Sequence, residues 1–156
     1  MSYIGEGDVS AVYRPVRGLP SLAGPTTTMQ FVAPGSVTRR QFGLFRREMQ
    51  PHSGGPDPHF HRTFSESFYV LRGTVRLYDG EQWVDATAGD FLYVPKGGIH
   101  AFNHDADEPA TMLILFAPGT PREGFFKEME AIRASGRELS PEEWTQVLAK
   151  HDQYMI

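Results

Sequence analysis

Residues 37–118 repeat short segments in which β-branched and aromatic residues alternate with polar ones, and turn residues separate these segments. A period of two residues is typical of β-strands with one buried face. Successive segments lie about 8–12 residues apart, which favours an antiparallel sandwich or barrel. The dipeptide Asp79-Gly80 between two of them indicates a tight two-residue hairpin turn. The predicted strands are Thr38–Met49, His59–Arg62, Ser67–Tyr78, Gln82–Asp85, Phe91–Val94, Ile99–Asn103 and Thr111–Phe116.

After residue 118 the pattern changes, and helix signals replace strand signals. An N-cap residue, a proline and a glutamate that closes a capping box occur in this order twice. The two sets are Thr120, Pro121, Glu123 and Ser140, Pro141, Glu143. Gly136 is expected to end the first helix. We predict two short helices within residues 119–156 that cover an open end or edge of the barrel. A lid that gates a pocket is the alternative.

Residues 1–36 are interrupted by glycine and proline, which indicates an extended arm rather than a packed layer. Within this arm, Thr26–Ala33 has the composition of a strand. An unpaired edge strand is an aggregation hazard, and an arm strand that adds to the sheet of a second copy would remove it. We therefore predict a homodimer with an exchanged arm strand. The expected organisation is an arm (1–36), an all-β barrel (37–118) and a helical segment (119–156).

Composition narrows the possible functions. The 156 residues include no cysteine, and the formal net charge is −4. The lack of cysteine excludes thiolate metal sites and fits a reducing compartment, so we expect a cytoplasmic protein. The sequence has no basic stripe of the kind that binds nucleic acid. It also has no apolar run of the roughly 20 residues that span a bilayer. The one basic cluster, "RRQFGLFRR" at Arg39–Arg47, is interpreted as a solvated strand face, with a phosphate site as the alternative.

Two of the six histidines, His59 and His61, are separated by a single residue in the stretch "PHFHRTFSESFYVLRG". On a strand, residues i and i+2 point to the same face, with their Cα atoms about 6.5–7 Å apart. Two imidazoles at this spacing can converge on one metal ion. Glu66 follows after a short bend, where a returning strand could bring its carboxylate to the same ion. On spacing alone, a chance pair of histidines remains the alternative.

The surroundings of these residues resemble the two signature motifs of the cupin superfamily. The first motif is matched by His59, His61, Glu66 and Gly73, and the second, in "GDFLYVPKGGIH", by Gly89, Pro95, Gly97 and His100. This resemblance implies a small double-stranded jelly-roll β-barrel. It also implies one divalent transition metal per chain, bound by His59, His61, Glu66 and His100.

The sequence departs from the family pattern in two places. Ser53 stands where the first motif usually opens with glycine, and Gly54 and Gly55 follow it. His104 replaces the final asparagine of the second motif. The polar turn around His104 predicts a surface position, and His52 is expected to be a loop residue.

The ligand set limits the metal and suggests the chemistry. Three imidazoles and one carboxylate without sulfur suit Fe, Mn, Ni, Co, Cu or Zn and do not select among them. Glu66 is the one ligand that could also take a proton from a substrate, so it is the candidate catalytic residue. Apolar pocket walls for a small-molecule ligand are expected from residues that are also ordinary core types. These residues are Phe68, Val70, Phe102 and Ile114.

Within the superfamily, segments such as "SESFYVLRGTVRLYDG" and "APGTPREGFFKEM" resemble single-domain quercetinase-like cupins. This resemblance implies a metal-dependent dioxygenase that acts on a small aromatic or enol-containing substrate. The same scaffold carries polyketide cyclases, isomerases and ligand-binding proteins without catalytic activity, and a fold does not determine a function. These alternatives remain open from the sequence.

Overall fold

The structure is a computed structural model that describes residues 5, 7 and 10–156. The remaining residues of the predicted arm, 1–4, 6 and 8–9, lie outside the described residues. A short 3-10 turn, η1 (Val16–Gly18), comes before the strands. The strands are β1 (Ser21–Ala23), β2 (Thr27–Ala33), β3 (Gly43–Met49), β4 (His59–Phe60), β5 (Ser65–Arg72), β6 (Thr74–Tyr78), β7 (Trp83–Thr87), β8 (Phe91–Val94), β9 (Ala101–Asn103), β10 (Ala110–Ala117) and β11 (Tyr154–Met155). Helices α1 (Arg122–Ser135) and α2 (Pro141–Lys150) lie between β10 and β11.

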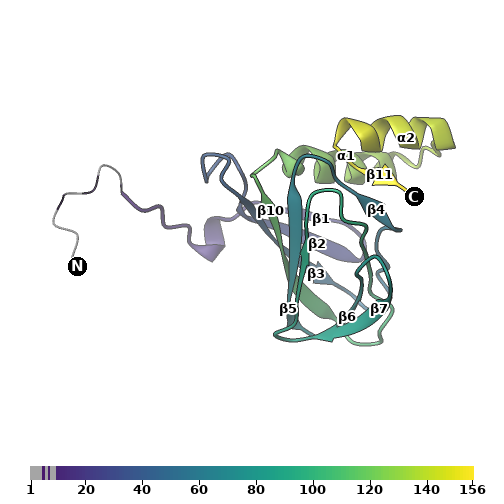
Figure 1. Ribbon diagram of the computed structural model, residues 1–156, viewed down its shortest axis with the longest axis horizontal. Helices are drawn as coiled ribbons and strands as arrows, with labels where there is room; N and C mark the ends of the chain where they lie inside the picture. Colours follow the sequence, from purple (N-terminus) through teal and green to yellow (C-terminus); the bar gives the residue numbers. More distant parts are fainter. Residues whose placement is uncertain (1–4, 6, 8–9) are drawn as a thin grey trace.

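The strands form a jelly-roll β-barrel, which confirms the predicted fold class (Figure 1). One sheet has the strand order β1-β2-β3-β10-β5-β8, and a second has the order β7-β6-β9. The short strand β4 pairs with β11 and is bridged to the start of β9 through His59 and His100. These strand pairs are antiparallel. Strands far apart in the sequence, such as β3 and β10, therefore lie side by side.

Alternate residues of the strands fill the barrel. Met112, Ile114 and Phe116 of β10 are each at most 2% exposed, as the two-residue period of a strand requires. Phe45 of β3 packs edge-on against Phe116, with ring centroids 5.7 Å apart. Full burial of such a side chain contributes about 1.5–3 kcal/mol. The hydrophobic alternation in the sequence therefore corresponds to the inner faces of the sheets.

Two turns differ from the predicted boundaries. The segment Ser67–Tyr78 is divided into β5 and β6 at Gly73, whose φ is 74°. A Cβ at this position would lie 2.5 Å from a backbone oxygen, so only glycine fits. The hairpin at Asp79-Gly80 joins β6 and β7 as predicted, but its loop spans residues 79–82 rather than two residues, because the last residue of β6 pairs with the first of β7.

The basic cluster does not form one solvated face, so that interpretation was wrong. Arg39 and Arg40 have φ angles of 55° and 61° in a turn, which is why β3 begins only at Gly43 rather than at the predicted Thr38. Arg47 instead points into the barrel, with its guanidinium 5.2 Å from the ring centroid of Phe102. The physical reason is the strand alternation, which places Arg47 on the same face as the buried residues of β3.

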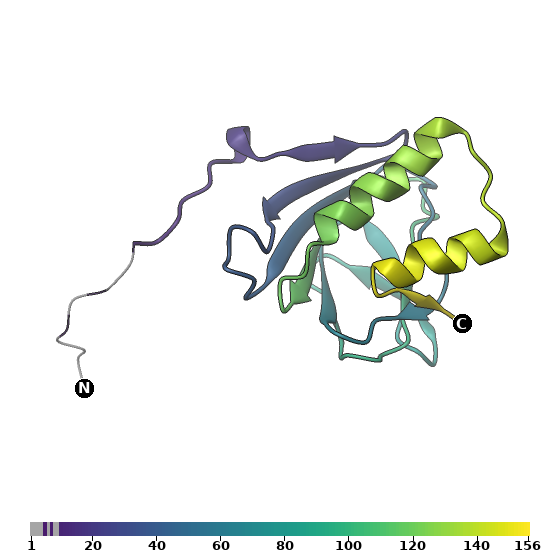
Figure 2. The ribbon, with the colours of Figure 1, turned by 90° about the horizontal axis from the view of Figure 1, so that it is seen from above.

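The predicted arm contributes two strands to the barrel. β2 pairs along its length with β3 of its own chain, and β1 pairs with β2. Met29 and Phe31 of β2 are buried in the core. The barrel therefore begins before residue 37, because β2 pairs with β3 within the chain, and the exchange of Thr26–Ala33 between two copies stays a prediction. Figure 2 shows that the described residues before β1 lead away from the barrel.

The two helices lie together at one end of the barrel (Figures 1 and 2). Phe126 of α1 reaches the core, where its ring centroid lies 5.2 Å from that of Phe45. This contact fixes α1 against the sheet, as the prediction of a covered barrel end requires. No helix in the part of the chain that the structure describes is long and apolar enough to cross a membrane.

The ends of the helices agree with the sequence signals in two of three cases. Ser140 and Glu143 form the predicted capping box of α2, and Gly136 ends α1 in the left-handed conformation. At the start of α1, however, Pro121 rather than Thr120 is the N-cap, and no side chain caps the helix. The chain makes a tight turn immediately before α1, and this turn buries the Thr120 hydroxyl without a hydrogen-bond partner.

The outer face of β5 and β8 exposes neighbouring aromatic side chains and leads to a prediction about assembly. Phe91 and Tyr93 are 61% and 59% exposed, and Phe91 is the cross-strand partner of the half-exposed Tyr69. Adjacent apolar side chains on a surface mark interaction sites.

We expect a homodimer through this face of β5 and β8, with twice the 17.5 kDa chain mass by light scattering at micromolar concentration. Phe91→Asp should give the monomer mass, and Val84→Asp on β7 should not. A wild-type protein of monomer mass would reject the dimer.

Candidate metal centre

Four side chains from different parts of the barrel meet at one point. His59 belongs to β4, His61 follows this strand, Glu66 lies on β5, and His100 directly precedes β9. The backbone N–H groups of His59 and His100 each donate to the carbonyl of the other residue at 3.0 Å. The rings of His59 and His61 lie on one face, as the strand period predicts, with centroids 5.0 Å apart.

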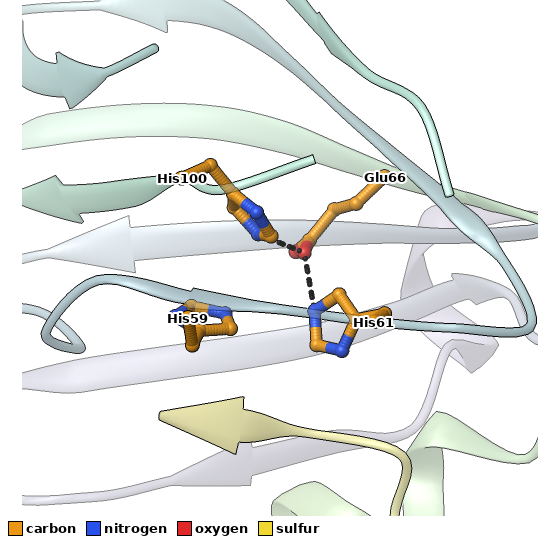
Figure 3. A group of neighbouring side chains, drawn as sticks. All are labelled: His59, His61, Glu66 and His100. Atoms are coloured by element: carbon orange, nitrogen blue, oxygen red, sulfur yellow. Dashed lines mark hydrogen bonds and ion pairs between the residues drawn. The ribbon is translucent and has the colours of Figure 1, made fainter. Parts of the chain in front are cut away.

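Glu66 connects the histidines of this cluster (Figure 3). Its Oε2 atom lies 3.0 Å from Nε2 of His61 and 2.8 Å from Nε2 of His100. Donor atoms of the four residues all lie within 4.8 Å of one another. None of the four residues is more than 6% exposed. The structure therefore brings the four predicted ligands together in one buried cluster.

All three histidines direct Nε2 toward the cluster because Nδ1 is engaged elsewhere. Each Nδ1 lies within hydrogen-bond distance of a backbone carbonyl, which can only accept. The carbonyls are those of Asp57 for His59 (2.7 Å), Asp152 for His61 (2.6 Å) and Gly98 for His100 (3.0 Å). Each Nδ1 carries a proton, so Nε2 is the ring atom that faces the Glu66 carboxylate, and it donates to the carboxylate only when the ring is protonated. In a neutral ring Nε2 presents a lone pair, which is repulsive toward the carboxylate unless a metal cation lies between these atoms.

Burial and the carboxylate shift the pKa values of the cluster in different directions. Burial, followed by repulsion from His100, lowers the pKa of His59 to about 4, so this ring is neutral near pH 7. Burial would raise the pKa of Glu66, but its hydrogen bonds with His100 and His61 outweigh burial and lower it. Burial would likewise lower the pKa of His100, but the hydrogen bond to Glu66 raises it. Glu66 is therefore an ionised carboxylate within the cluster.

The donor set fits a divalent transition metal. Donors that share one ion at bond lengths of about 2.1 Å lie roughly 3–4.2 Å apart, close to the separations in this cluster. Three neutral imidazole nitrogens and one carboxylate would supply the negative charge and lone pairs that such an ion requires. His59, His61, Glu66 and His100 would hold the ion, and imidazole and carboxylate ligands suit several first-row metals equally.

The C-terminal segment fixes the orientation of His61. The His61 ring donates to the Asp152 carbonyl. The Asp152 carboxylate accepts hydrogen bonds from the backbone N–H groups of Arg62 and Thr63 at 3.0 and 2.8 Å. The Thr63 hydroxyl donates to the same carboxylate at 2.6 Å. These contacts connect the residues after α2 to the loop that carries His61. Hydrogen-bond partners of this kind set the tautomer and direction of a metal ligand.

We expect Asp152→Asn to weaken metal binding by about 10-fold or more, because outer hydrogen-bond partners of ligands typically contribute 10–100-fold to affinity. Asparagine tolerates the left-handed backbone of this residue, whose φ is 56°, but loses a carboxylate acceptor. Competition with a chromophoric chelator measures the affinity. Asp107→Asn is the matched control, since the Asp107 carboxylate pairs with the surface residue His52 and not with the metal cluster. An unchanged affinity in Asp152→Asn would contradict the prediction.

A cavity of about 410 Å³ adjoins the cluster, and His59 and Glu66 form part of its wall. Phe102 and Ile114 line it, as predicted from the sequence. Phe68 and Val70 do not contribute to its lining. Both have no exposed surface, and the Phe68 ring packs 5.7 Å from that of Phe102, so core packing uses their side chains instead.

The helices form a second wall of this cavity. Phe125 and Met129 of α1 and Leu148 of α2 line it together with strands β1, β2 and β3. The sequence predicted that the helices cover the barrel, with a lid over a pocket as the alternative, and the structure places them in the cavity wall. The same cavity is also lined by Arg47 and Arg122, which the sequence analysis did not select. Arg47 lies on the same face of β3 as the buried residues of that strand, and this pattern could have identified it. No local pattern marks Arg122.

The other histidines lie outside the cluster. His104 has no exposed surface, and its Nδ1 donates to the Thr74 carbonyl at 3.0 Å, so the predicted surface position was wrong. The residue is buried because its backbone bridges to Gly54. His52 is an exposed loop residue as expected, and its ring contacts Asp105 and Asp107.

Comparison with known proteins agrees with this geometry. Residues 45–116 match the family model described as "Cupin domain". A quercetin 2,3-dioxygenase of Bacillus subtilis (strain 168) is 31% identical over 71 residues, which cover 46% of this chain and 20% of that protein. The matched region therefore spans only one fifth of that relative's length.

Solved structures with the same fold have low sequence identity to this chain. KdgF from Halomonas sp. superimposes with a TM-score of 0.63 at 14% identity, covering 73% of this chain and 99% of that protein. The polyketide cyclase RemF from Streptomyces resistomycificus superimposes with a TM-score of 0.58 at 19% identity, covering 69% and 80%. At these identities the likeness extends to the fold.

Proposed function

This chain belongs to the cupin superfamily, and we propose that it is a metal-dependent dioxygenase that acts on a small aromatic or enol-containing molecule. The observation that supports the proposal most directly is the buried cluster of three histidines and Glu66 in the wall of a 410 Å³ cavity. A cavity of this volume suits a small molecule. The partial match to a quercetin 2,3-dioxygenase favours oxygen chemistry over the other activities of the scaffold.

The residues of the cavity have separate roles in this proposal. One divalent metal held by the cluster would act as a Lewis acid on a substrate oxygen and would support reaction with dioxygen. Glu66 is the only carboxylate of the cluster, and it accepts the proton that the enol or phenol releases. The apolar side chains of Phe102, Ile114 and Phe125 exclude water from the reacting atoms.

Oxygen uptake tests the proposal. Metal-supplemented protein is screened with flavonols, diketones and catechols in an oxygen electrode, and the same protein treated with a chelator is the control. We expect substrate-dependent uptake that chelation removes and metal addition restores. Product formation without oxygen uptake would favour a cyclase or isomerase, and ligand binding without turnover would favour a binding protein.

A further inference from the structure

Two guanidinium groups line the same cavity as His59 and Glu66. Arg122 is 4% exposed, and Arg47 points into the barrel. Neither arginine forms an ion pair with a carboxylate among the described residues. An unpaired buried charge destabilises a folded protein, so it calls for an explanation.

The cavity also contains hydrogen-bond donors without acceptors. Nε of Arg47, Nε of Arg122 and Oγ of Ser53 are buried, and each lacks a partner among the described residues. Buried polar groups are nearly always hydrogen-bonded, so unpaired donors beside the cavity make its wall favourable for a ligand that carries an acceptor group. The Glu66 carboxylate in the cavity wall does not fill this role, because the histidine cluster already engages it.

The two arginines differ in how much of each guanidinium is free. Nη1 of Arg122 donates to the His151 carbonyl at 2.8 Å, and Nη2 donates to Oε1 of Gln153 at 3.3 Å. The Arg122 guanidinium also lies 4.0 Å from the ring centroid of Phe125. By contrast, no hydrogen bond to a described residue engages the Arg47 guanidinium, which lies over the ring of Phe102. Arg47 can therefore offer its planar fork of N–H groups to a ligand, and Arg122 mainly adds positive charge.

We propose that the ligand of this cavity is a small carboxylic acid with an apolar body, whose carboxylate binds Arg47 in a region made more positive by Arg122. The planar guanidinium matches a carboxylate through two parallel hydrogen bonds. The aromatic and aliphatic wall residues accommodate the apolar body. The inference rests on the proposed function only in placing the ligand beside Glu66, and it narrows the substrate class to an organic acid.

Burial without a counterion lowers the pKa of each arginine to about 10, and both remain cationic near pH 7. Burial is the larger cause in Arg122, where Glu66 and Asp152 oppose it. Glu130 and Arg133 also line the cavity, but they pair with each other at 2.8 Å and their charges cancel. The cavity wall therefore carries two guanidinium cations and one uncompensated carboxylate, Glu66, so its net charge is positive. A divalent metal would add further positive charge. This balance favours an anion over a neutral flavonol or diketone.

Matched pairs of ligands test the proposal on the metal-loaded full chain. One pair is 3,4-dihydroxybenzoate and 3,4-dihydroxybenzyl alcohol, and the other is 3-phenylpropanoate and 3-phenylpropanol, each titrated by calorimetry up to millimolar concentration. We expect the wild type to prefer the acid of a pair by about 10-fold or more, the usual scale for a charged hydrogen bond. Arg47→Met should reduce the preference to within about twofold and leave the affinity for the alcohol unchanged. Arg46→Met, one residue away on the opposite face of β3, should keep the wild-type preference.

Three results would overturn the proposal. The wild type could bind acids and alcohols equally, it could fail to bind the acids at millimolar concentration, or the preference for acids could survive Arg47→Met. Phenyl phosphate that binds more tightly than benzoate would overturn the carboxylate class. A melting temperature measured without ligand separates binding from structure: Arg47→Met should melt no lower than the wild type, because it removes a buried unpaired charge, and a clear loss of stability would overturn the binding role. Oxygen uptake is recorded separately, so acid binding without uptake rejects only the dioxygenase, and uptake with neutral substrates but no acid preference rejects only this inference.

Discussion

Replacing His61 with alanine is expected to remove most of the divalent metal that the protein carries after metal-supplemented growth. The substitution deletes one of three nitrogen donors and one of the two histidine contacts of Glu66, which lies 3.0 Å from His61 Nε2. Metal affinity depends steeply on the number of correctly placed donors. Elemental analysis of protein purified without an affinity tag should give about one ion per chain for the wild type.

His52→Ala is the matched control for this experiment, because His52 is an exposed histidine that contacts only Asp105 and Asp107 among the described side chains. It should retain the wild-type metal content. His61→Ala also removes a ring stacked on Phe64 at 4.4 Å, so its circular dichroism spectrum must show that the chain is folded. Full metal occupancy in a folded variant with His59, His61 and His100 all replaced by alanine would reject the assignment of the site.

Replacing Glu66 with glutamine is expected to lower turnover of an identified substrate by roughly 10²-fold or more, the usual scale for a general base. Glutamine keeps an oxygen that can remain near His61 and His100 but cannot accept the substrate proton. Part of the metal should therefore be retained while the proton transfer is lost. Initial rates are divided by the measured metal content, so that loss of metal and loss of the base are separated.

Glu128→Gln is the control for loss of a carboxylate elsewhere, since Glu128 contacts Lys150 and His151 on the helices rather than the cluster. Its turnover should equal that of the wild type. If Glu66→Gln with bound metal reacts at the wild-type rate, Glu66 is a ligand and not the base.

Much of the barrel could be predicted from local sequence. Strand alternation depends only on the side-chain period of two, so Phe91–Val94 was predicted with its observed bounds and Ala110–Ala117 to within one residue at each end. The capping box at Ser140 and the glycine end of α1 are equally local, because each satisfies backbone groups within a few residues. The four members of the cluster were identified through the resemblance of two short stretches of the chain to the cupin motifs, whereas the spacing of the histidines alone left a chance pair open.

Other features depended on contacts between distant parts of the chain. β2 belongs to the barrel because it pairs with β3, and His104 is buried because its backbone bridges to Gly54, yet neither partner choice is encoded in a short window of sequence. The orientation of His61 by Asp152 joins residues 91 positions apart. Strand pairing and loop closure over such distances are set by the packing of the whole domain.

The sequence by itself determined an all-β sandwich or barrel through its strand period, and the four residues of the cluster through the resemblance of two short stretches to the cupin motifs. Only the tertiary structure decided what surrounds the cluster. It placed Arg47 inside the barrel, brought Arg122 from the start of α1 to the same cavity, and used Phe68 and Val70 for core packing rather than for the wall. The charge and shape of a cavity are sums over side chains from many elements, so they exist only after these elements have packed together.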